Sequence, residues 1–381
     1  MKYFMGFGLL IIILVVGCND DPKFSSSETG VAGDGNLHAI LDQIKTDFKV
    51  PALGAMMLVG DSILEAEAAG ERAFGFGVMV TDNDQWHIGA ITKAMTATLA
   101  AILVEEGLIN WETTAGEIFS TSLIRREFAD VRLEEFFYHT SGTINDITRI
   151  PSWGGDRENI EDIISLRKQW ALELLNFEPE VVRGVFNYSN GGYIIAGAML
   201  EAVTDWSWED LITERLFAPL GMKNSGFGSP GTGGKHLQPY GHFKGGDLWI
   251  PVEPGPLADN PPPLGPAGTI HSTLQDFALY LKMHKDGANG ISDFLKPDSF
   301  QKLHTPFPGS NYAMGWQTGE VGGNKILAHN GSNTLWFAEV RVEPDRDYVI
   351  MIVTNSGNTG GQDAIIKGIQ TMTSRFDKLD Q

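Results

Sequence analysis

Strand-like segments at both ends of the chain enclose a long helical middle, and this arrangement restricts the fold more than any other feature. Runs of alternating or continuous apolar residues occur at 53–59 and 63–68 near the start and at 335–342 and 348–354 near the end, a pattern typical of β-strands. Residues from about 115 to 228 are mostly helical in pattern instead. We therefore expect an α/β fold of the α+β type: one antiparallel sheet built from both termini, flanked by helices, with a mostly helical inserted subdomain (about 115–228).

Local patterns give the limits of the other elements. Ala, Leu and Met dominate 92–106, and Gly107 follows, as is typical of a helix and its C-terminal cap. A third early strand is expected at 72–76, and 247–252 could add another within the Gly- and Pro-rich loop region 229–268. Further helices are expected at 37–48, 133–138, 160–175, 193–203, 208–216 and 364–376.

The composition favours one large folded body. Of the 381 residues, 42% are hydrophobic and 20% are charged, as in packed globular proteins. Lys and Arg number 28 against 48 Asp and Glu, which gives a formal charge of −20. A field of this sign repels phosphate backbones, so nucleic-acid binding is not expected. The length fits one large domain with an insertion better than two separate lobes.

The first residues have the pattern of a bacterial export signal. Lys2 precedes an apolar run from Phe4 to Val16, which is short for a membrane span but suits the core of a signal peptide. Residues 14–18 read Leu-Val-Val-Gly-Cys and resemble a lipobox, in which the signal is removed before a cysteine that becomes acylated. These features predict a lipoprotein signal peptide at 1–17.

Lipidation would fall on Cys18, the single cysteine of the sequence. One cysteine excludes an intramolecular disulfide and a cysteine-based zinc site. The polar residues 18–35 are expected to form a flexible tether, and 36–376 the folded domain. We therefore expect an exported bacterial protein of the cell envelope, held to the membrane by a lipid anchor on the periplasmic face or at the cell surface.

A lysine lies in the first turn of the helix expected at 92–106. Residues 87–97 read HIGAITKAMTA, so Lys93 follows Ala90 by three positions. Side chains three apart share one helix face and lie side by side. Helix-terminal N–H groups and burial disfavour a charged ammonium, which would allow Lys93 to accept a proton.

Two later segments complete a set of three ordered motifs, Tyr188-Ser189-Asn190 and His329-Asn330-Gly331-Ser332. Together with residues 90–93 they resemble the Ser-x-x-Lys, Tyr-x-Asn and His-x-Gly motifs of the penicillin-recognising serine enzymes, which include class C β-lactamases, D,D-peptidases and related esterases. The resemblance covers roughly residues 36–375 and implies a beta-lactamase/transpeptidase-like serine hydrolase domain. Residues 139–142 and 265–276 also match family segments, which are interpreted as structural.

The resemblance assigns catalysis to residue 90, Lys93 and Tyr188, the last two as groups that transfer protons. The family carries its nucleophilic serine at position 90, but this sequence has Ala90, whose methyl group cannot be acylated. Thr92 points to another helix face and Ser189 belongs to the second motif, so neither is a convincing substitute. The form as written is expected to be catalytically silent.

Substrate binding is assigned to Asn190, His329, Gly331 and Ser332. Asn190 would orient substrate and lysine, and His329 would bind a carboxylate or polarise the site. Gly331 would let the substrate backbone approach the strand closely. The backbone N–H groups of residues 90 and 332 would form an oxyanion hole. No metal and no cofactor is implied.

Ala90 leaves two main hypotheses open. One is an active parent enzyme whose nucleophile was removed, since Lys93, Tyr188, Asn190 and His329 all remain. The other is a natural pseudo-enzyme, a lipid-anchored binding module for cell-wall peptides or similar acyl ligands. A structural envelope protein with a vestigial site is a third interpretation.

The expected substrate is a small acyl compound or a peptide, attacked at an ester, amide or β-lactam carbonyl through an acyl-enzyme. Loops at about 143–158 and 229–268 would set substrate choice. Because of the His-x-Gly motif and the lipoprotein-like start, we favour a small ester or a D-amino-acid amide over a β-lactam as the expected substrate. The sequence carries no zinc-protease, phosphate-loop or nucleophile-elbow motif and no signal for an oligomeric state.

Overall fold

The structure is a computed structural model that describes residues 29–155, 157–158 and 160–379. The expected signal peptide at 1–17 and the expected lipidation site Cys18 lie outside these residues. Within the described part of the chain, no helix combines the length and the apolar character needed to cross a membrane.

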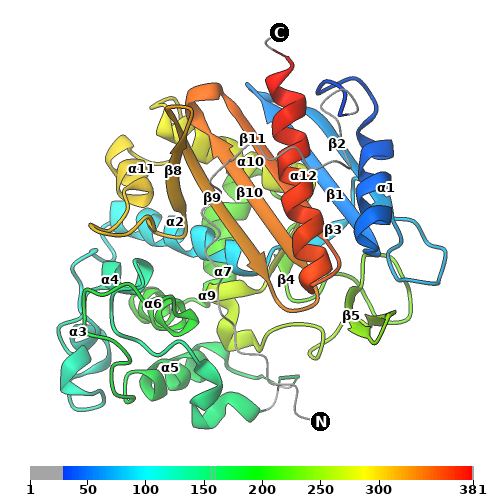
Figure 1. The fold of residues 1–381 in the computed structure, drawn as a ribbon. Helices are drawn as coiled ribbons and strands as arrows, with labels where there is room; N and C mark the ends of the chain where they lie inside the picture. Colours follow the sequence, from blue (N-terminus) through cyan, green and yellow to red (C-terminus); the bar gives the residue numbers. More distant parts are fainter. Residues whose placement is uncertain (1–28, 156, 159, 380–381) are drawn as a thin grey trace.

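Six antiparallel strands form the main sheet, in the order β2-β1-β11-β10-β9-β8 (Figure 1). The N-terminal part supplies β1 (Ala52–Val59) and β2 (Ser62–Gly70). The C-terminal part supplies β8 (Gln317–Val321), β9 (Asn324–Ser332), β10 (Phe337–Glu343) and β11 (Tyr348–Thr354). β1 pairs directly with β11, with Leu53 opposite Thr354. The expectation that both termini build one antiparallel sheet is therefore confirmed.

Helices cover both faces of this sheet. One face carries α1 (Leu37–Phe48) and α12 (Thr359–Asp377), and the other carries α2 (Thr92–Glu105) and α10 (Leu274–Ala288) (Figure 1). Ile350 and Ile352 of β11 pack with α1 and α12, whereas Met351 and Val353 belong to the larger core on the other side. Every residue of β11 is buried, because a central strand covered on both faces has no solvent side.

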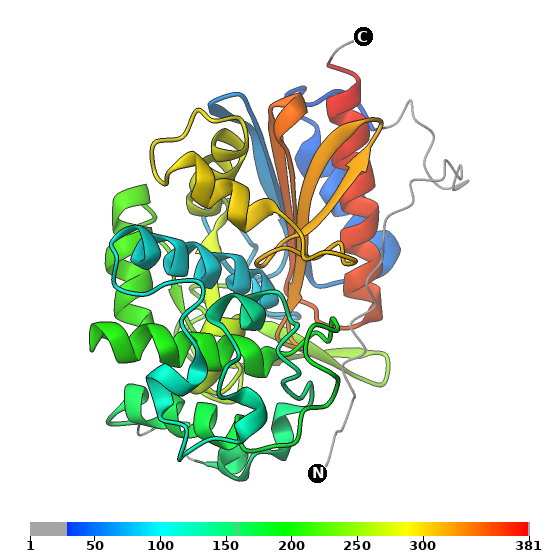
Figure 2. The ribbon, with the colours of Figure 1, turned by 90° about the vertical axis from the view of Figure 1, so that its left-hand side faces the viewer.

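The middle of the chain forms a helical part at one end of the sheet (Figure 2). Its α-helices are α3 (Ala115–Phe119), α4 (Leu133–Phe137), α5 (Ile163–Leu174), α6 (Asn190–Thr204), α7 (Trp208–Ile212) and α8 (Ala218–Leu220). A π-helical turn at 213–217 joins the last two. The Ser189 hydroxyl accepts a hydrogen bond from the backbone N–H of Gly192 and so caps α6. The second motif therefore lies at the start of this helix.

Smaller elements connect the sheet to the helical part. β3 (Gln85–His87), β7 (Ile270–Thr273) and β4 (Gly226–Phe227) form a second sheet, and β5 (Gly241–Gly245) and β6 (Leu248–Val252) form a hairpin. The remaining α-helices of the described chain are α9 (Gly265–Gly268) and α11 (Pro297–His304). β3 leads directly into the turn before α2, so its pairing with β7 fixes the position of the first motif.

The strand expected at 72–76 is wrong, because this segment is a loop. Gly75 and Gly77 have φ values of 85° and 69°, which lie in the left-handed region and not in the range typical of β-strands. The Glu71 carboxylate accepts hydrogen bonds from the backbone N–H groups of both glycines, at 2.7 and 3.2 Å, and so holds the loop. The possible strand at 247–252 is confirmed as β6.

The expected tether also ends earlier than residue 35. Its described part, 29–35, packs against α12 through Arg375, which donates to Asp34 Oδ1 at 2.8 Å. The backbone N–H of Ala32 donates to the Arg375 carbonyl at 3.2 Å, and the Ala32 side chain is buried. Arg375 also pairs with Glu65 of β2. This guanidinium therefore ties the start of the described chain to both ends of the domain.

Candidate active site

The turn before α2 places residue 90 against strand β9. Residues 89–91 form a 3₁₀ turn that runs into α2, and Gly89 has a φ of 52°. A Cβ atom added to Gly89 would lie 2.8 Å from the carbonyl carbon of Gly331. A Cβ atom added to Gly331 would lie 2.6 Å from the backbone nitrogen of Ala90. The two backbones that carry the expected oxyanion hole, those of residues 90 and 332, are thus packed directly together.

Lys93 lies in the first turn of α2 and has no exposed surface. Its Nζ donates to Asn190 Oδ1 and to the Ala267 carbonyl, both at 2.8 Å, and lies 4.8 Å from the centre of the Tyr188 ring. Burial lowers the pKa of Lys93 well below its usual value. A neutral amine has two N–H bonds and one lone pair. Because both N–H bonds have acceptors, the lone pair remains available to take a proton.

Tyr188 is held beside this amine by the segment that precedes α6. Its hydroxyl is buried and has no hydrogen-bond partner among the described residues. Burial raises the pKa of Tyr188, so the phenol keeps its proton. Asn190, the first residue of α6, faces the same amine through its side-chain oxygen. The structure therefore brings Lys93, Tyr188 and Asn190 together from two helices.

His139 is a site residue that the sequence interpretation took as structural only. Its carbonyl accepts from Asn187 N–H at 2.8 Å, and its Nδ1 accepts from Ser189 N–H at 3.1 Å. The two hydrogen bonds bracket Tyr188, whose ring centre lies 4.3 Å from that of His139. The segment 139–142 was visible in the sequence as a family match, but nothing local indicated this contact.

His329 lies close to the site but does not have the geometry expected of a carboxylate binder. It is buried, its Nδ1–H donates to the Asn330 carbonyl at 2.5 Å, and its Nε2 accepts from the Tyr312 hydroxyl at 3.0 Å. Burial lowers the pKa of His329 to about 3, so the ring is neutral. With both nitrogens engaged, this ring offers no N–H and no charge to a ligand.

Gly331 and Ser332 also differ from the roles expected for their side chains. The space beside Gly331 is occupied by backbone of residues 88–91, so glycine is required there by the turn before α2 and not by a substrate. The Ser332 hydroxyl donates to the Trp336 carbonyl at 2.7 Å and accepts from Thr334 N–H at 2.9 Å. Only backbone groups of Ser332 are left for an incoming ligand.

The neighbouring hydroxyls have partners of their own. Thr92 has no exposed surface, and its Oγ1 accepts from Ile270 N–H at 3.2 Å. Ser189 is buried and donates to the Ile144 carbonyl at 2.6 Å. Neither hydroxyl faces the position of the missing nucleophile as a free group. Ala90 itself is partly exposed, so position 90 is open to a ligand.

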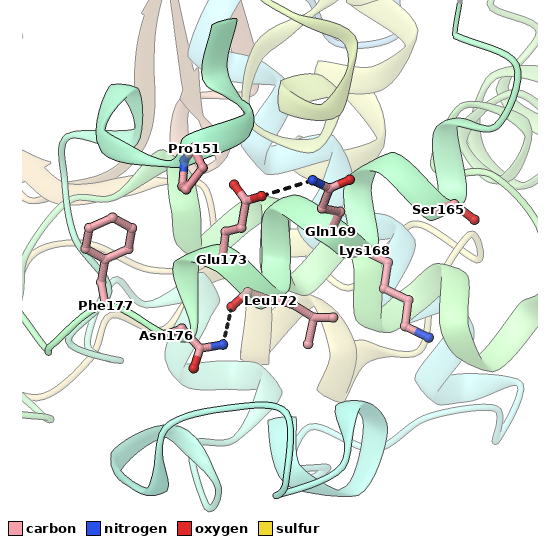
Figure 3. Close-up of a pocket in the computed structure, with 8 residues that line it drawn as sticks. All are labelled: Pro151, Ser165, Lys168, Gln169, Leu172, Glu173, Asn176 and Phe177. Carbon is pink, nitrogen blue, oxygen red and sulfur yellow. Dashed lines mark hydrogen bonds between the residues drawn. The ribbon is translucent and has the colours of Figure 1, made fainter. Parts of the chain in front are cut away.

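The pocket drawn in Figure 3 does not belong to this site. It has a volume of about 510 Å³ and lies along α5, where Gln169, Glu173 and Asn176 form hydrogen bonds with each other or with the helix backbone (Figure 3). Residues of the three motifs are missing from its lining. Across the described residues, no group of three or more His, Cys, Asp or Glu is placed to hold a metal ion.

Comparison with known sequences gives a consistent set of relatives. The sequence profile of the family described as Beta-lactamase matches residues 37–368. Penicillin-binding protein 4 of Amycolatopsis lactamdurans is 27% identical over 337 residues, which are 83% of this chain and 84% of that protein. Unguisins hydrolase ungD of Aspergillus violaceofuscus (strain CBS 115571) is 23% identical over 88% of this chain, which spans 64% of that protein's length.

Solved structures give the same result for the fold. The D-amino acid amidase from Ochrobactrum anthropi SV3, complexed with L-phenylalanine amide, has a TM-score of 0.73 and 18% identity over 92% of this chain and 99% of its own. The octameric penicillin-binding protein homologue from Pyrococcus abyssi has a TM-score of 0.68 and 22% identity over 89% and 77%. The expected beta-lactamase/transpeptidase-like fold is confirmed.

Proposed function

The chain belongs to the beta-lactamase family, and from this membership we propose that its site is an acyl-transfer site of a serine hydrolase in which only the nucleophilic oxygen is missing. The observation that carries the proposal is the state of Lys93. Its amine is buried, burial lowers its pKa well below the usual value, and Nζ donates to Asn190 Oδ1 and to the Ala267 carbonyl. This state is useful to a base and costly to a residue with a purely structural role.

With serine at position 90, each group would have a defined task. Lys93 takes the hydroxyl proton while the serine oxygen bonds to the substrate carbonyl carbon. The backbone N–H groups of residues 90 and 332 receive the oxyanion. Lys93 and Tyr188 return a proton to the departing alcohol or amine, which leaves an acyl-enzyme. Water then repeats the sequence and releases the acid.

As written, the chain would bind an ester or amide without cleaving it. The Ala90 methyl group cannot form the acyl bond, while Lys93, Tyr188 and Asn190 keep their places. Removal of a nucleophile leaves only the catalysis that comes from binding and oxyanion stabilisation. The chain is therefore a silent form of an enzyme, held in the cell envelope if the sequence at 1–18 acts as a lipoprotein signal.

For the substrate, we favour a small ester or a D-amino-acid amide over a β-lactam. The neutral His329 has both ring nitrogens engaged and offers no positive charge to a substrate carboxylate, and burial lowers the pKa of Lys93. The name of one similar protein, a D-amino acid amidase, agrees with an amide substrate.

The test is hydrolysis of a chromogenic ester, a D-amino-acid p-nitroanilide and a chromogenic cephalosporin by the unmodified chain and by Ala90→Ser. We expect turnover from Ala90→Ser alone, with the ester or the anilide preferred. Ala90→Gly is the matched control, since it changes the same position without supplying an oxygen. A folded Ala90→Ser protein that hydrolyses none of the three would refute the proposal.

A second candidate is a binding module for cell-wall peptides or similar acyl ligands, favoured by the alanine at position 90, which cannot be acylated. Calorimetry with a D-alanyl-D-alanine peptide distinguishes the two. Binding by both the unmodified chain and Ala90→Ser, with no hydrolysis by either, would support the module.

A further inference from the structure

A single buried carboxylate joins the two chain segments that carry the proposed oxyanion hole. Asp259 lies in the loop before α9, and its side chain is only 5% exposed. Its Oδ1 lies 2.8 Å from His87 Nε2 and accepts from Asn333 Nδ2 at 3.0 Å. Its Oδ2 is buried without a hydrogen-bond partner among the described residues. Of the two Asp259 oxygens, only Oδ1 therefore contacts the side chains of His87 and Asn333.

Two sets of contacts, here called arms, start at Asp259. The first arm leads through His87 toward residue 90. His87 ends β3 with a fully buried side chain. Its Nδ1 accepts from Gly89 N–H at 3.1 Å, so its proton resides on Nε2, which lies 2.8 Å from Asp259 Oδ1 in close contact but without the alignment of a hydrogen bond. The ring also stacks on Trp336, with centroids 5.6 Å apart. The imidazole thus lies between the carboxylate and the backbone N–H of Gly89, the residue before Ala90.

The second arm runs from Asp259 to residue 332. Asn333 follows Ser332 and is buried. Its Oδ1 accepts from the backbone N–H groups of Leu335 and Trp336, at 3.1 and 3.2 Å, while its Nδ2 donates to Asp259. This side chain fixes the turn between β9 and β10. The carboxylate is therefore one residue away from the backbone of Ser332.

Stability alone does not explain this arrangement. Removing a carboxylate from water costs several kcal/mol, and an unpaired oxygen adds to that cost. Apolar side chains of similar size often stabilise a buried position as well or better. A carboxylate that aligns two separate backbones offers something that an apolar side chain cannot, namely a fixed distance between them.

We propose that Asp259 is a positioning residue that sets the relative place of the backbone N–H groups of residues 90 and 332 through His87 and Asn333. The expected effect of Asp259 on catalysis rests on the proposed function. Its effect on the backbone positions of residues 90 and 332 does not, because it can be measured in the unmodified chain. In this role Asp259 makes no contact with substrate.

The first measurement is the amide ¹H–¹⁵N spectrum of the labelled chain with and without Asp259→Asn. We expect the resonances of residues 90 and 332 both to move. In His87→Gln, which removes the first arm and leaves the second in place, the resonance of residue 90 should move further than that of residue 332. Asp345→Asn is the matched control, because Asp345 accepts a hydrogen bond from Lys325 N–H at the other end of β9. Unmoved resonances of residues 90 and 332 in folded Asp259→Asn would overturn the inference.

The second measurement uses Ala90→Ser as the parent. Loss of one oxyanion donor costs about 10²–10³ in kcat, so we expect misplacement of both by Asp259→Asn to lower kcat roughly 10–100-fold. KM should change less than about twofold, because ground-state contacts are kept. A raised KM with unchanged kcat would count against positioning. If Ala90→Ser shows no turnover, the proposed function fails, and the amide spectra still decide the role of Asp259.

Discussion

At the residue scale, the environment of Lys93 decides what the site can do. An exposed lysine is protonated below about pH 10, whereas burial lowers the pKa of Lys93. An ordinary lysine titrates near pH 10.5. We therefore expect the kcat/KM of Ala90→Ser to decrease on acidification only at a pH well below 10.5, where Lys93 becomes protonated. A pH profile of kcat/KM measures it. A decrease already near pH 10.5 would mean that Lys93 is charged in the free enzyme.

The same residue gives a mutational prediction. Adding Lys93→Met to Ala90→Ser removes the proposed base and should lower kcat by roughly 10²–10⁴. Lys168→Met, at an exposed position on α5, should leave kcat unchanged and serves as the control. Both substitutions are made in Ala90→Ser. Equal kcat values for Ala90→Ser/Lys93→Met and Ala90→Ser/Lys168→Met would exclude Lys93 from the chemistry.

Gly331 gives a prediction about stability. A methyl group there would meet the Ala90 backbone nitrogen at 2.6 Å, and overpacking of this kind typically costs about 1–3 kcal/mol. We expect Gly331→Ala to lower the free energy of unfolding by that amount. Gly319→Ala is the matched control in β8, because its added methyl group meets nothing within 4 Å. Denaturant unfolding of both variants makes the comparison.

The sequence could predict which residues meet at the site but not how each is paired. The resemblance of residues 90–93 and 188–190 to the family motifs was enough to predict that Lys93, Tyr188 and Asn190 belong to one site. The state of His329 depends on Tyr312, which lies on a loop without any local signal. The contribution of Asp259 depends on a side chain more than 70 residues from either partner, so no short pattern could reveal it.

At the element scale, α5, α6 and α7 are joined by one buried guanidinium. Arg167 of α5 has no exposed surface and pairs with Glu201 of α6 and with Glu209 of α7. Breaking a buried pair from one side typically costs about 3–5 kcal/mol. We expect this loss in unfolding free energy for Arg167→Met. The exposed pair of Arg215 with Glu106 is the control, and Arg215→Met should cost less than about 1 kcal/mol. Similar losses in the two variants would contradict this account.

Long elements could be predicted from sequence because their periodicity is local. The helices at 37–48 and 92–106 and the strands at 53–59 and 348–354 match the structure within about two residues. The short strands β3, β4 and β7 were missed, because two to four residues carry no readable period and pair only after folding.

At the scale of the whole molecule, buried histidines make stability depend on pH. Burial lowers the pKa of six of them, His139, His242, His271, His284, His304 and His329. The unfolded chain binds protons at these positions near pH 6.5, and the folded chain does not. The contribution of these histidines to stability is therefore complete above pH 6.5 and is lost as the pH falls, by about 1.4 kcal/mol per histidine and pH unit.

The measurement is the midpoint of thermal unfolding between pH 7.5 and 5.0, with enough salt to screen the acidic surface. We expect a steep decrease below pH 6.5. His304→Gln removes one of the six groups, whose pKa burial lowers to about 3, and should make the decrease shallower. A midpoint that is constant or rises toward pH 5 would contradict neutral buried histidines.

The pairing of β1 with β11 also dictates an order of assembly. Leu53 and Thr354 are strand partners, so about 300 residues must leave the ribosome before the first strand of the sheet meets its neighbour on that side. Until then β1 and β2 have only each other as strand partners, with α1 available to cover one face, and a two-stranded hairpin is marginally stable in water. The main sheet therefore closes only after β11 has been synthesised, so the central pairing of the domain forms at the end of translation.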